Sequence, residues 1–210
     1  MIGQLLFTPE IEGDVKLCVV DMSMLDNDLL SRFDNITHEK RRREKAAAAF
    51  AVGQLMGYDA VIGHAADGHP FVENHTGSLS ISHADNILVA AYSADKVIGI
   101  DIEYPRAVLR RVAPKFLSEE ELTVYREPAD LLRAWTIKEA VYKAALVKGL
   151  SLFAIHLPLT WSEKKEAVVT IQNQSIVNRL YFARLGDAMI TLAVRGDSIY
   201  RDRDCSSPPV

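Results

Sequence analysis

Residues 97–103 are Val-Ile-Gly-Ile-Asp-Ile-Glu. From residue 98 on, isoleucine alternates with glycine or an acidic residue, and this pattern is the strongest indication of the fold. Side chains alternate between the two faces of a β-strand, so the isoleucines form one apolar face. Gly99, Asp101 and Glu103 share the other face. The pattern predicts a strand that is buried on one side and carries two neighbouring carboxylates on the other.

The two carboxylates have two explanations. Like charges this close repel each other, unless a cation lies between them or both reach water. Hard oxygen ligands suit magnesium, which usually takes one or two carboxylates and completes its octahedron with phosphate oxygens and water. A polar strand face that is simply solvated is the commoner arrangement. The strand alone leaves both explanations open.

A helix follows this strand, from about Ala129 to Val147, with Gly149 just past its end. Within it, Glu139 and Lys143 are four residues apart and project from the same side, so that a carboxylate and an ammonium can act together. An ordinary surface pair, worth a few tenths of a kcal/mol, is the alternative. Three apolar residues of the helix are expected to face the core: Trp135, Val141 and Ala145.

Ser82 and His83 are expected at the end of a short strand, Leu79 to Ser82, where a turn begins. A hydroxyl and an imidazole in that position can donate hydrogen bonds to phosphate oxygens. A turn-forming serine beside a solvent-exposed histidine explains them equally well. A hydrolytic triad is disfavoured, because no G-x-S-x-G sequence surrounds the serine.

An earlier helix, from about Thr37 to Met56 and stopped by Gly57, carries a dense cationic cluster in its first two turns. Guanidinium groups there can bind a phosphate monoester through paired hydrogen bonds. A solvated face balanced by Glu39 and Glu44 is at least as common. The basic residues of the cluster are Lys40, Arg41, Arg42, Arg43 and Lys45.

The remaining elements are shorter. Strands are expected near residues 14–20, 87–92, 167–171, 180–185 and 189–194. Ser118 and Glu121 match a capping box that opens another helix. Glycine, histidine, proline and asparagine dominate residues 63–86, which are expected to be mainly loops.

The composition limits the class of protein. The chain has 210 residues, 49% of them hydrophobic, with 24 basic and 28 acidic residues and a net charge of −4. Such a chain can bury a large core, and its charge does not favour non-specific binding of nucleic acid. Two cysteines in dissimilar surroundings indicate neither a disulfide framework nor a zinc site. We expect a soluble, unexported protein of the cytoplasm.

Taken in order, several stretches resemble the motif series of the 4'-phosphopantetheinyl transferase superfamily. The decisive part is a G-[IV]-D-x-E strand followed, about 35 residues later, by W-[ST]-x-K-E-[AS]-x-x-K, a composite pattern that is rarely met by chance. The length resembles the larger, monomeric branch of the surfactin-synthetase-activating type. The stretches are GHPF (68–71), SLSISH (78–83), IGIDIE (98–103), FLSEEEL (116–122) and WTIKEAVYKAALVKGLSL (135–152).

The resemblance implies roles for individual residues. It makes Asp101, Glu103 and Glu139 the ligands of Mg²⁺, with Glu139 also serving as the base or orienting a water that is the base. Lys143 would bind the diphosphate of coenzyme A and neutralise charge as the bond breaks.

The resemblance also implies coenzyme contacts outside this group. Ser82 and His83 would contact the diphosphate, and Arg43 with its neighbours would bind the 3'-phosphate. His69 is expected to contact the coenzyme from a turn where the family often has lysine, so that a neutral imidazole replaces a fixed charge.

The resemblance further implies an α+β fold of two similar halves, each with an antiparallel sheet packed on a long helix. We expect the first half at residues 1–104, the second at 105–200 and a disordered tail at 201–210. The implied activity is that of a holo-[acyl-carrier-protein] synthase, which transfers the phosphopantetheine arm of coenzyme A to a serine of an apo acyl or peptidyl carrier protein. A non-catalytic binding module and a nucleic-acid-binding protein remain the alternatives, although the acidic total charge disfavours the second.

Overall fold

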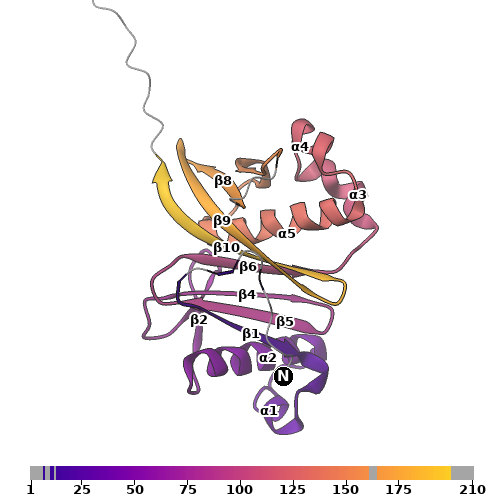
Figure 1. Ribbon diagram of the computed structural model, residues 1–210. Helices are drawn as coiled ribbons and strands as arrows, with labels where there is room; N and C mark the ends of the chain where they lie inside the picture. Colours follow the sequence, from indigo (N-terminus) through magenta and orange to yellow (C-terminus); the bar gives the residue numbers. More distant parts are fainter. Residues whose placement is uncertain (1–6, 8–9, 12, 161–164, 200–210) are drawn as a thin grey trace, which may run out of the picture.

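The computed structural model describes residues 7, 10–11, 13–160 and 165–199 (Figure 1). The tail expected at 201–210 lies outside these residues. Over the part of the chain that is described, no helix is both long and apolar enough to cross a membrane.

The order of elements follows the sequence prediction, with several additions. Strands β2 and β3 lie in a region expected to be mainly loop, and β9 and β10 are longer than expected. The strands are β1 (Val15–Asp21), β2 (Ile62–His64), β3 (Pro70–Val72), β4 (Ser78–Ala84), β5 (Ile87–Ser93), β6 (Ile98–Glu103), β7 (Ile155–His156), β8 (Glu166–Ile171), β9 (Gln174–Leu185) and β10 (Ala188–Ile199). The helices are α1 (Asn27–Ser31), α2 (Glu39–Met56), α3 (Val108–Val112), α4 (Glu119–Val124) and α5 (Pro128–Ala145), with short 3-10 helices at Met22–Met24, Ala113–Lys115 and Leu152–Ala154.

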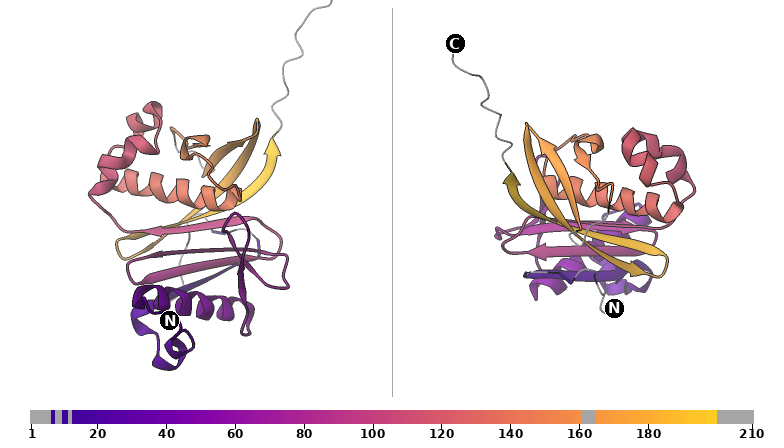
Figure 2. Two further views of the ribbon diagram at one scale, coloured as in Figure 1. Left: turned by 180° about the vertical axis from the view of Figure 1, so that it is seen from behind. Right: turned by 45° about the horizontal axis from the view of Figure 1, so that its top comes forward.

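The strands form antiparallel sheets that carry the long helices on their outer faces. One sheet has the order β1-β5-β4, another has the order β6-β10-β9-β8-β7, and β2 pairs with β3 alone. Helix α2, the three-stranded sheet, the five-stranded sheet and helix α5 are stacked in that order, as Figures 1 and 2 show. The expected α+β class with antiparallel sheets is confirmed.

Strand β6 belongs by its hydrogen bonds to the sheet of the second half. It pairs with β10, where Asp101 lies opposite Thr191 and Glu103 opposite Met189. The boundary expected at residue 104 had grouped this strand with the first half. The strand that carries two candidate ligands therefore lies in the same sheet on which α5 packs.

A row of serines on β4 joins the two sheets where their edge strands meet. The Ser78 hydroxyl accepts a hydrogen bond from the backbone N–H of Ile98 at 3.1 Å, and the Ser80 hydroxyl accepts one from Ile100 at 2.9 Å. These side chains satisfy N–H groups of β6 that face away from β10, and an unpaired buried N–H would be costly. The serines thereby fix how β4 lies against β6.

Both long helices are followed by a C-cap residue in the left-handed conformation. Helix α2 ends at Gly57, as predicted, where φ is 79°. Helix α5 begins with Pro128, whose fixed φ suits the first helical turn, and ends at Ala145, with Leu146 as its C-cap at φ 55°. The end was expected at about Val147 with Gly149 just past it, and Gly149 has a positive φ in the turn that follows.

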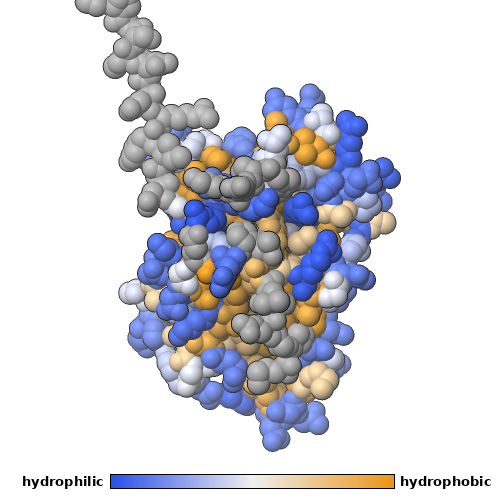
Figure 3. All heavy atoms as spheres, viewed as in Figure 1, coloured by the Kyte–Doolittle hydropathy of each residue, from blue (hydrophilic) through white to orange (hydrophobic). Residues whose placement is uncertain are grey.

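The space between the two sheets is filled by an apolar cluster. Ile98, Ile100 and Ile102 point into it, as the alternation of the strand predicts. Phe7 and Ile11, near the beginning of the chain, pack against the same cluster. Figure 3, viewed as Figure 1, shows hydrophobic side chains gathered along the middle of the face that is turned to the reader, with hydrophilic side chains on both sides.

Candidate functional site

A hollow of about 310 Å³ lies where β4, β6 and α5 meet. Three segments that are far apart in the sequence therefore contribute to one site, and each supplies residues that the sequence singled out. The lining residues are Ile81, Ser82, His83, Asp101, Ile102, Glu103, Trp135, Glu139 and Lys143.

Helix α5 crosses β6 at very close range, and Gly99 makes this possible. A Cβ atom at Gly99 would lie 2.0 Å from the carbonyl oxygen of Ala140 and 2.6 Å from the backbone nitrogen of Ala144. No side chain fits in that space, so the two backbones approach directly. Glu139 and Lys143 are thereby held above the polar face of the strand.

Asp101 is buried on this face and has defined partners. Its Oδ1 accepts a hydrogen bond from the Ser82 hydroxyl at 2.7 Å and one from the Lys143 ammonium at 2.8 Å. The same ammonium donates to the carbonyl oxygen of Ile100 at 2.9 Å. The solvated strand face is therefore wrong for Asp101, because α5 covers it.

Glu103 lines the same hollow and is only partly buried. Its Oε1 accepts a hydrogen bond from the backbone N–H of Tyr104 at 2.9 Å and forms an ion pair with Nε of Arg106 at 2.9 Å. Arg106 also pairs with Asp85 at 3.2 Å. This carboxylate is thus charge-balanced by a group that itself reaches solvent.

Glu139 is the unbalanced member of the group. Within the described ranges its carboxylate has no hydrogen bond or ion pair, although it lines the hollow with Asp101 and Glu103. Burial raises the pKa of Glu139, the charge of Asp101 raises it further, and Lys143 opposes the rise. The site therefore holds a carboxylate whose ionised form is disfavoured when no further cation is nearby.

Glu139 and Lys143 share one side of α5, as predicted, but they do not form the ordinary helical ion pair that was the alternative. The Lys143 ammonium bonds across to β6 instead. Its side chain is 26% exposed and its partner Asp101 is 7% exposed, so this contact is shielded far more than a surface pair. The lysine joins α5 to the strand that carries the carboxylates.

The donor set fits a magnesium ion in its chemistry. Oxygen atoms of three carboxylates border one hollow, and only the Glu139 carboxylate lacks a partner among the described residues. In the arrangement seen, no three acidic, histidine or cysteine side chains of residues 13–160 or 165–199 converge closely enough to form a metal-binding cluster. Lys143 and Arg106 supply the neighbouring positive charge.

Two comparisons with known proteins bear on this arrangement. A sequence profile of the 4'-phosphopantetheinyl transferase superfamily matches residues 97–191. The 4'-phosphopantetheinyl transferase HetI of Nostoc sp. (strain PCC 7120) is 30% identical over 158 residues, which cover 66% of this chain and 67% of HetI. The chain belongs to the 4'-phosphopantetheinyl transferase superfamily.

The superfamily match contains two of the elements that line the hollow. Strand β6 and helix α5 lie inside residues 97–191, and so does the part of β10 that pairs with β6 at Asp101. Strand β4 and helix α2 precede it. The three carboxylates and Lys143 are therefore the part of the site that this superfamily profile covers.

Ser82 and His83 both line the hollow, although neither stands at the end of its strand. Strand β4 continues to Ala84, so their side chains alternate. Ser82 is 8% exposed and donates to Asp101, whereas His83 faces outward and has its Nδ1 3.7 Å from Glu44 on α2. Ser82 is held by the carboxylate, and His83 remains accessible to a ligand.

The cationic cluster of α2 is largely paired within its own surroundings. Arg43 contacts Glu39 at 3.2 Å and donates to the carbonyl oxygen of Met22 at 3.2 Å. Arg42 pairs with Asp34 at 3.0 Å. These contacts favour the charge-balanced face, and Arg43 is not among the residues that line the hollow.

His69 lies outside the carboxylate hollow. It lines two adjoining hollows beyond Lys143, and its Nδ1 lies 2.5 Å from Oδ1 of Asp67. Lys143 borders both the carboxylate hollow and the nearer of these two. A ligand that extends past Lys143 would therefore reach His69.

Trp135 is a site residue that the sequence reasoning missed. It was expected to face the core, and it does pack edge-on against Phe116, with ring centroids 5.0 Å apart. It is only partly buried, however, and it also lines the hollow. The signal was available, because Trp135 precedes Glu139 by four residues and such residues share a helix side.

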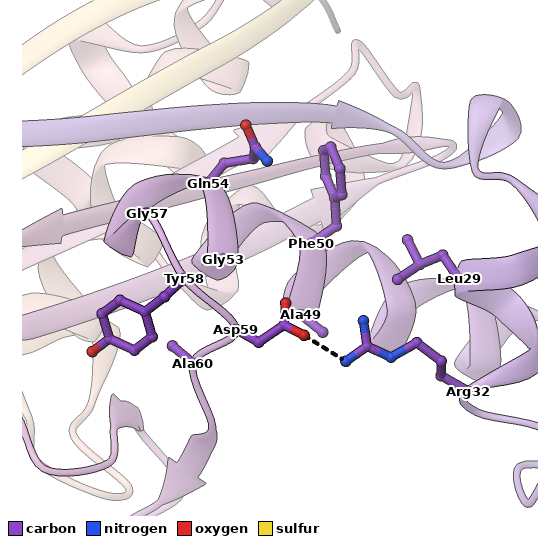
Figure 4. A pocket seen from close by; sticks show the side chains of 10 residues that line it. All are labelled: Leu29, Arg32, Ala49, Phe50, Gly53, Gln54, Gly57, Tyr58, Asp59 and Ala60. Carbon is purple, nitrogen blue, oxygen red and sulfur yellow. Dashed lines mark hydrogen bonds and ion pairs between the residues drawn. The ribbon is translucent and has the colours of Figure 1, made fainter.

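A different hollow, of about 290 Å³, lies against α2 (Figure 4). Arg32 and Asp59, which both line it, form an ion pair with 3.2 Å between Nη2 and Oδ2. Phe50, Gly53 and Tyr58 are among the residues around it. It contains no residue that the sequence singled out as part of the site, and we assign it no role in the chemistry.

Proposed function

We propose that this protein is a magnesium-dependent enzyme that transfers the 4'-phosphopantetheine arm of coenzyme A to a serine of an apo acyl or peptidyl carrier protein. The observation that carries the proposal is the meeting of Asp101, Glu103, Glu139 and Lys143 around one hollow. Membership of the superfamily and the similarity to the 4'-phosphopantetheinyl transferase HetI support the same reaction. Adenosine 3',5'-bisphosphate would be the second product.

In this proposal Asp101, Glu103 and Glu139 hold Mg²⁺ together with the diphosphate of coenzyme A. When bound, the metal would supply positive charge that offsets the charge developing on the leaving phosphate. Glu139 is the residue best suited to receive a cation, because its burial and the neighbouring Asp101 disfavour its ionised form in the protein alone. The carboxylate oxygens are also the ligand type that magnesium prefers.

The proposed chemistry needs no nucleophile from this chain. The serine hydroxyl of the carrier attacks the phosphorus that bears the pantetheine arm, and a new P–O bond forms. The bond from that phosphorus to the bridging oxygen breaks, and the bridging oxygen keeps the electron pair. Glu139, directly or through a water molecule, takes the proton of the serine hydroxyl.

Lys143 stabilises the charge that accumulates on the diphosphate. Lys143 borders both the carboxylate hollow and the hollow beyond it. In this proposal the diphosphate, with the P–O bond that breaks, extends past Lys143 from one hollow toward the other. A fixed positive charge in a partly buried site stabilises developing negative charge more than it would in water. The contact to Asp101 at 2.8 Å holds that charge in place.

The remaining coenzyme contacts are proposed from position for Ser82, His83 and His69, and from the family resemblance for Arg43. His83 and Ser82 border the hollow and would contact the diphosphate. His69 borders the next hollow and would contact the coenzyme further along. Arg43 would bind the 3'-phosphate after exchanging its contact with Glu39 for the ligand. A cytoplasmic monomer is part of the same proposal.

Mass spectrometry of an apo carrier protein tests this proposal. The carrier is incubated with the wild-type protein, coenzyme A and Mg²⁺, and a gain of about 340 Da is expected as one arm is attached. The serine-to-alanine variant of the carrier is the matched control and gains nothing. Binding of coenzyme A without any mass gain across a panel of apo carriers would identify a non-catalytic binding module instead.

A further inference from the structure

Lys138 carries an ammonium group that is completely buried, and the proposed reaction does not use it. Its side chain is 0% exposed and that of its partner Glu121 is 6% exposed. The ammonium lies 3.0 and 2.8 Å from the two carboxylate oxygens of Glu121. It also donates to the carbonyl oxygens of Leu152 and Ile155, at 3.1 and 2.5 Å.

Glu121 is equally engaged, so the pair ties three separate segments to α5. One Glu121 oxygen accepts from the backbone N–H of Ser118 at 2.9 Å, which completes the capping box of α4. The other accepts from the backbone N–H of Leu157 at 2.8 Å. The start of α4, the turn at Leu152 and strand β7 therefore all meet at one charged centre inside the second half.

A buried ion pair of this kind is poorly explained by stability alone. Removing two charges from water is costly, and apolar residues of similar volume are often as stabilising or more so. Burial lowers the pKa of Lys138, and the carboxylate of Glu121 opposes this by favouring the charged form. A buried ion pair in which every donor and acceptor is satisfied restricts the surrounding segments to a single arrangement, because each hydrogen bond has a required direction.

The geometry that this centre fixes is the orientation of α5. Lys138 directly precedes Glu139 in the helix, so any rotation that moved its ammonium from its acceptors would move Glu139 as well. On another side the Thr136 hydroxyl contacts that of Thr191 on β10 at 2.7 Å. At Gly99 the backbones are too close to tolerate a shift toward the strand.

We propose that the Lys138–Glu121 pair is a positioning device that orients α5 so that Glu139 and Lys143 face the carboxylates of β6. The inference rests on the proposed transferase function and assigns no contact with substrate to either residue. Small displacements of catalytic groups cost large factors in rate. Loss of the pair therefore lowers kcat, whereas KM for coenzyme A changes little.

The test separates stability from positioning with an apolar replacement. In the double variant Glu121→Leu and Lys138→Met, both charges are removed together, so no unpaired charge remains buried. The backbone N–H of Leu157 and the carbonyl oxygens of Leu152 and Ile155 lose their partners, so we expect a lower melting temperature with a still cooperative transition. At a temperature where the variant is folded, we expect kcat to be reduced by at least about ten-fold. A folded double variant that keeps wild-type kcat would overturn the inference.

A second variant keeps the inference testable if the double variant does not fold. Glu121→Asp retains both charges and shortens the carboxylate arm by one methylene, so the ammonium must move to keep its partner. A several-fold fall in kcat at unchanged KM for coenzyme A is expected, and unchanged kcat would contradict the positioning role. Lys16→Met, which removes an exposed lysine of β1, is the control and leaves both constants as they are.

The failure of this inference is distinguishable from failure of the proposed function. If the wild-type protein attaches no arm to any carrier, the proposed function fails and kcat has no meaning. If the wild type is active and the variants equal it, only the positioning role is lost.

Discussion

The ammonium of Lys143 on α5 lies 2.8 Å from Oδ1 of Asp101 on β6, inside a site that the helix itself covers. The two residues are separated by a long stretch of sequence, and their contact depends on Gly99, which lets the helix approach the strand. The same approach brings Glu139 over the strand carboxylates.

Replacing Asp101 should remove transfer while leaving the fold intact. In Asp101→Asn and Asp101→Ala we expect kcat to fall by at least about 100-fold, because a charged ligand of the proposed metal is lost. Labelling of an apo carrier protein measures the rate, and circular dichroism checks the fold. Unchanged labelling by a folded Asp101→Ala protein would refute the metal assignment.

Lys143 should matter far more than an exposed ion pair. Loss of such a pair is worth less than about 1 kcal/mol and would change a rate only a few-fold. Lys143→Met, which keeps the length of the side chain, should reduce kcat by at least about 100-fold, because the charge facing the diphosphate is lost. Lys16→Met serves again as the matched control, and equal rates for the two variants would return Lys143 to an ordinary structural role.

Gly99 and Gly53 offer a matched pair of glycine substitutions. An added Cβ at Gly99 would meet the backbone of α5 at 2.0 Å, whereas at Gly53 its nearest neighbour would be 3.5 Å away. Gly99→Ala should destabilise the protein by roughly 3 kcal/mol, because α5 must move away from β6. Gly53→Ala should stabilise α2 by about 0.5–1 kcal/mol.

Thermal unfolding measures both substitutions. The stability lost in Gly99→Ala corresponds to a melting temperature lower by about 6–12 °C for a chain of this size. If Gly99→Ala melted no lower than Gly53→Ala, the helix and strand would not be as close as the structure places them.

Glu139 should limit the stability of the metal-free protein at neutral pH. Its pKa is raised above the ordinary value of 4.5, so the folded state holds the proton more tightly than the unfolded state does. The stability that this provides is fully present below pH 4.5 and is lost as the pH rises through the folded-state pKa. Glu139→Gln, which cannot ionise, should therefore melt higher than the wild type at pH 7 in chelator.

The pH dependence provides the check on this prediction. The difference between the two proteins should shrink as the pH approaches 4.5, since both side chains are then neutral. Glu139→Gln should also attach no measurable arm to a carrier, so stability and activity change in opposite directions. A melting temperature that falls at pH 7 would mean that Glu139 has a stabilising partner in solution.

Much of the secondary structure could be predicted from local patterns. The alternation of residues 97–103 places three isoleucines in the core between the sheets, and Gly57 ends α2 where its sequence predicts. The capping box of Ser118 and Glu121 is present as expected. Patterns of this kind depend on neighbours within one turn or one strand, which the sequence displays directly.

The parts that could not be predicted depend on tertiary contacts. Helix α5 is capped by Leu146 in the left-handed conformation, whereas the sequence had pointed to Gly149 as the residue just past the helix. The pairing of β6 with β10 joins residues that are far apart in the sequence. The sequence likewise gave no indication that Asp101 is buried or that Lys138 pairs with Glu121.

The candidate site likewise has features that could be inferred from the sequence and features that could not. The shared side of Glu139 and Lys143 could be inferred from helical spacing, and that they face Asp101 and Glu103 was implied only by the family resemblance. The pairing of Arg43 with Glu39 agrees with the charge-balanced face that helical spacing allowed. The contacts of Arg43 with the carbonyl oxygen of Met22 and of His69 with Asp67 could not be inferred, because neither follows from helix or strand spacing. Their roles in binding coenzyme A stay predictions.

The most direct test of the central claim is the metal dependence of arm transfer by the wild-type protein. Coenzyme A and an apo carrier are incubated with the protein in chelator, and Mg²⁺ is then added in excess while the carrier mass is followed. The account predicts no mass gain before the addition and a gain of about 340 Da after it. The triple variant Asp101→Asn, Glu103→Gln and Glu139→Gln should give no mass gain either before or after the addition. Transfer at full rate in chelator, or by the triple variant, would contradict the claim that these three carboxylates bind a metal that the reaction requires.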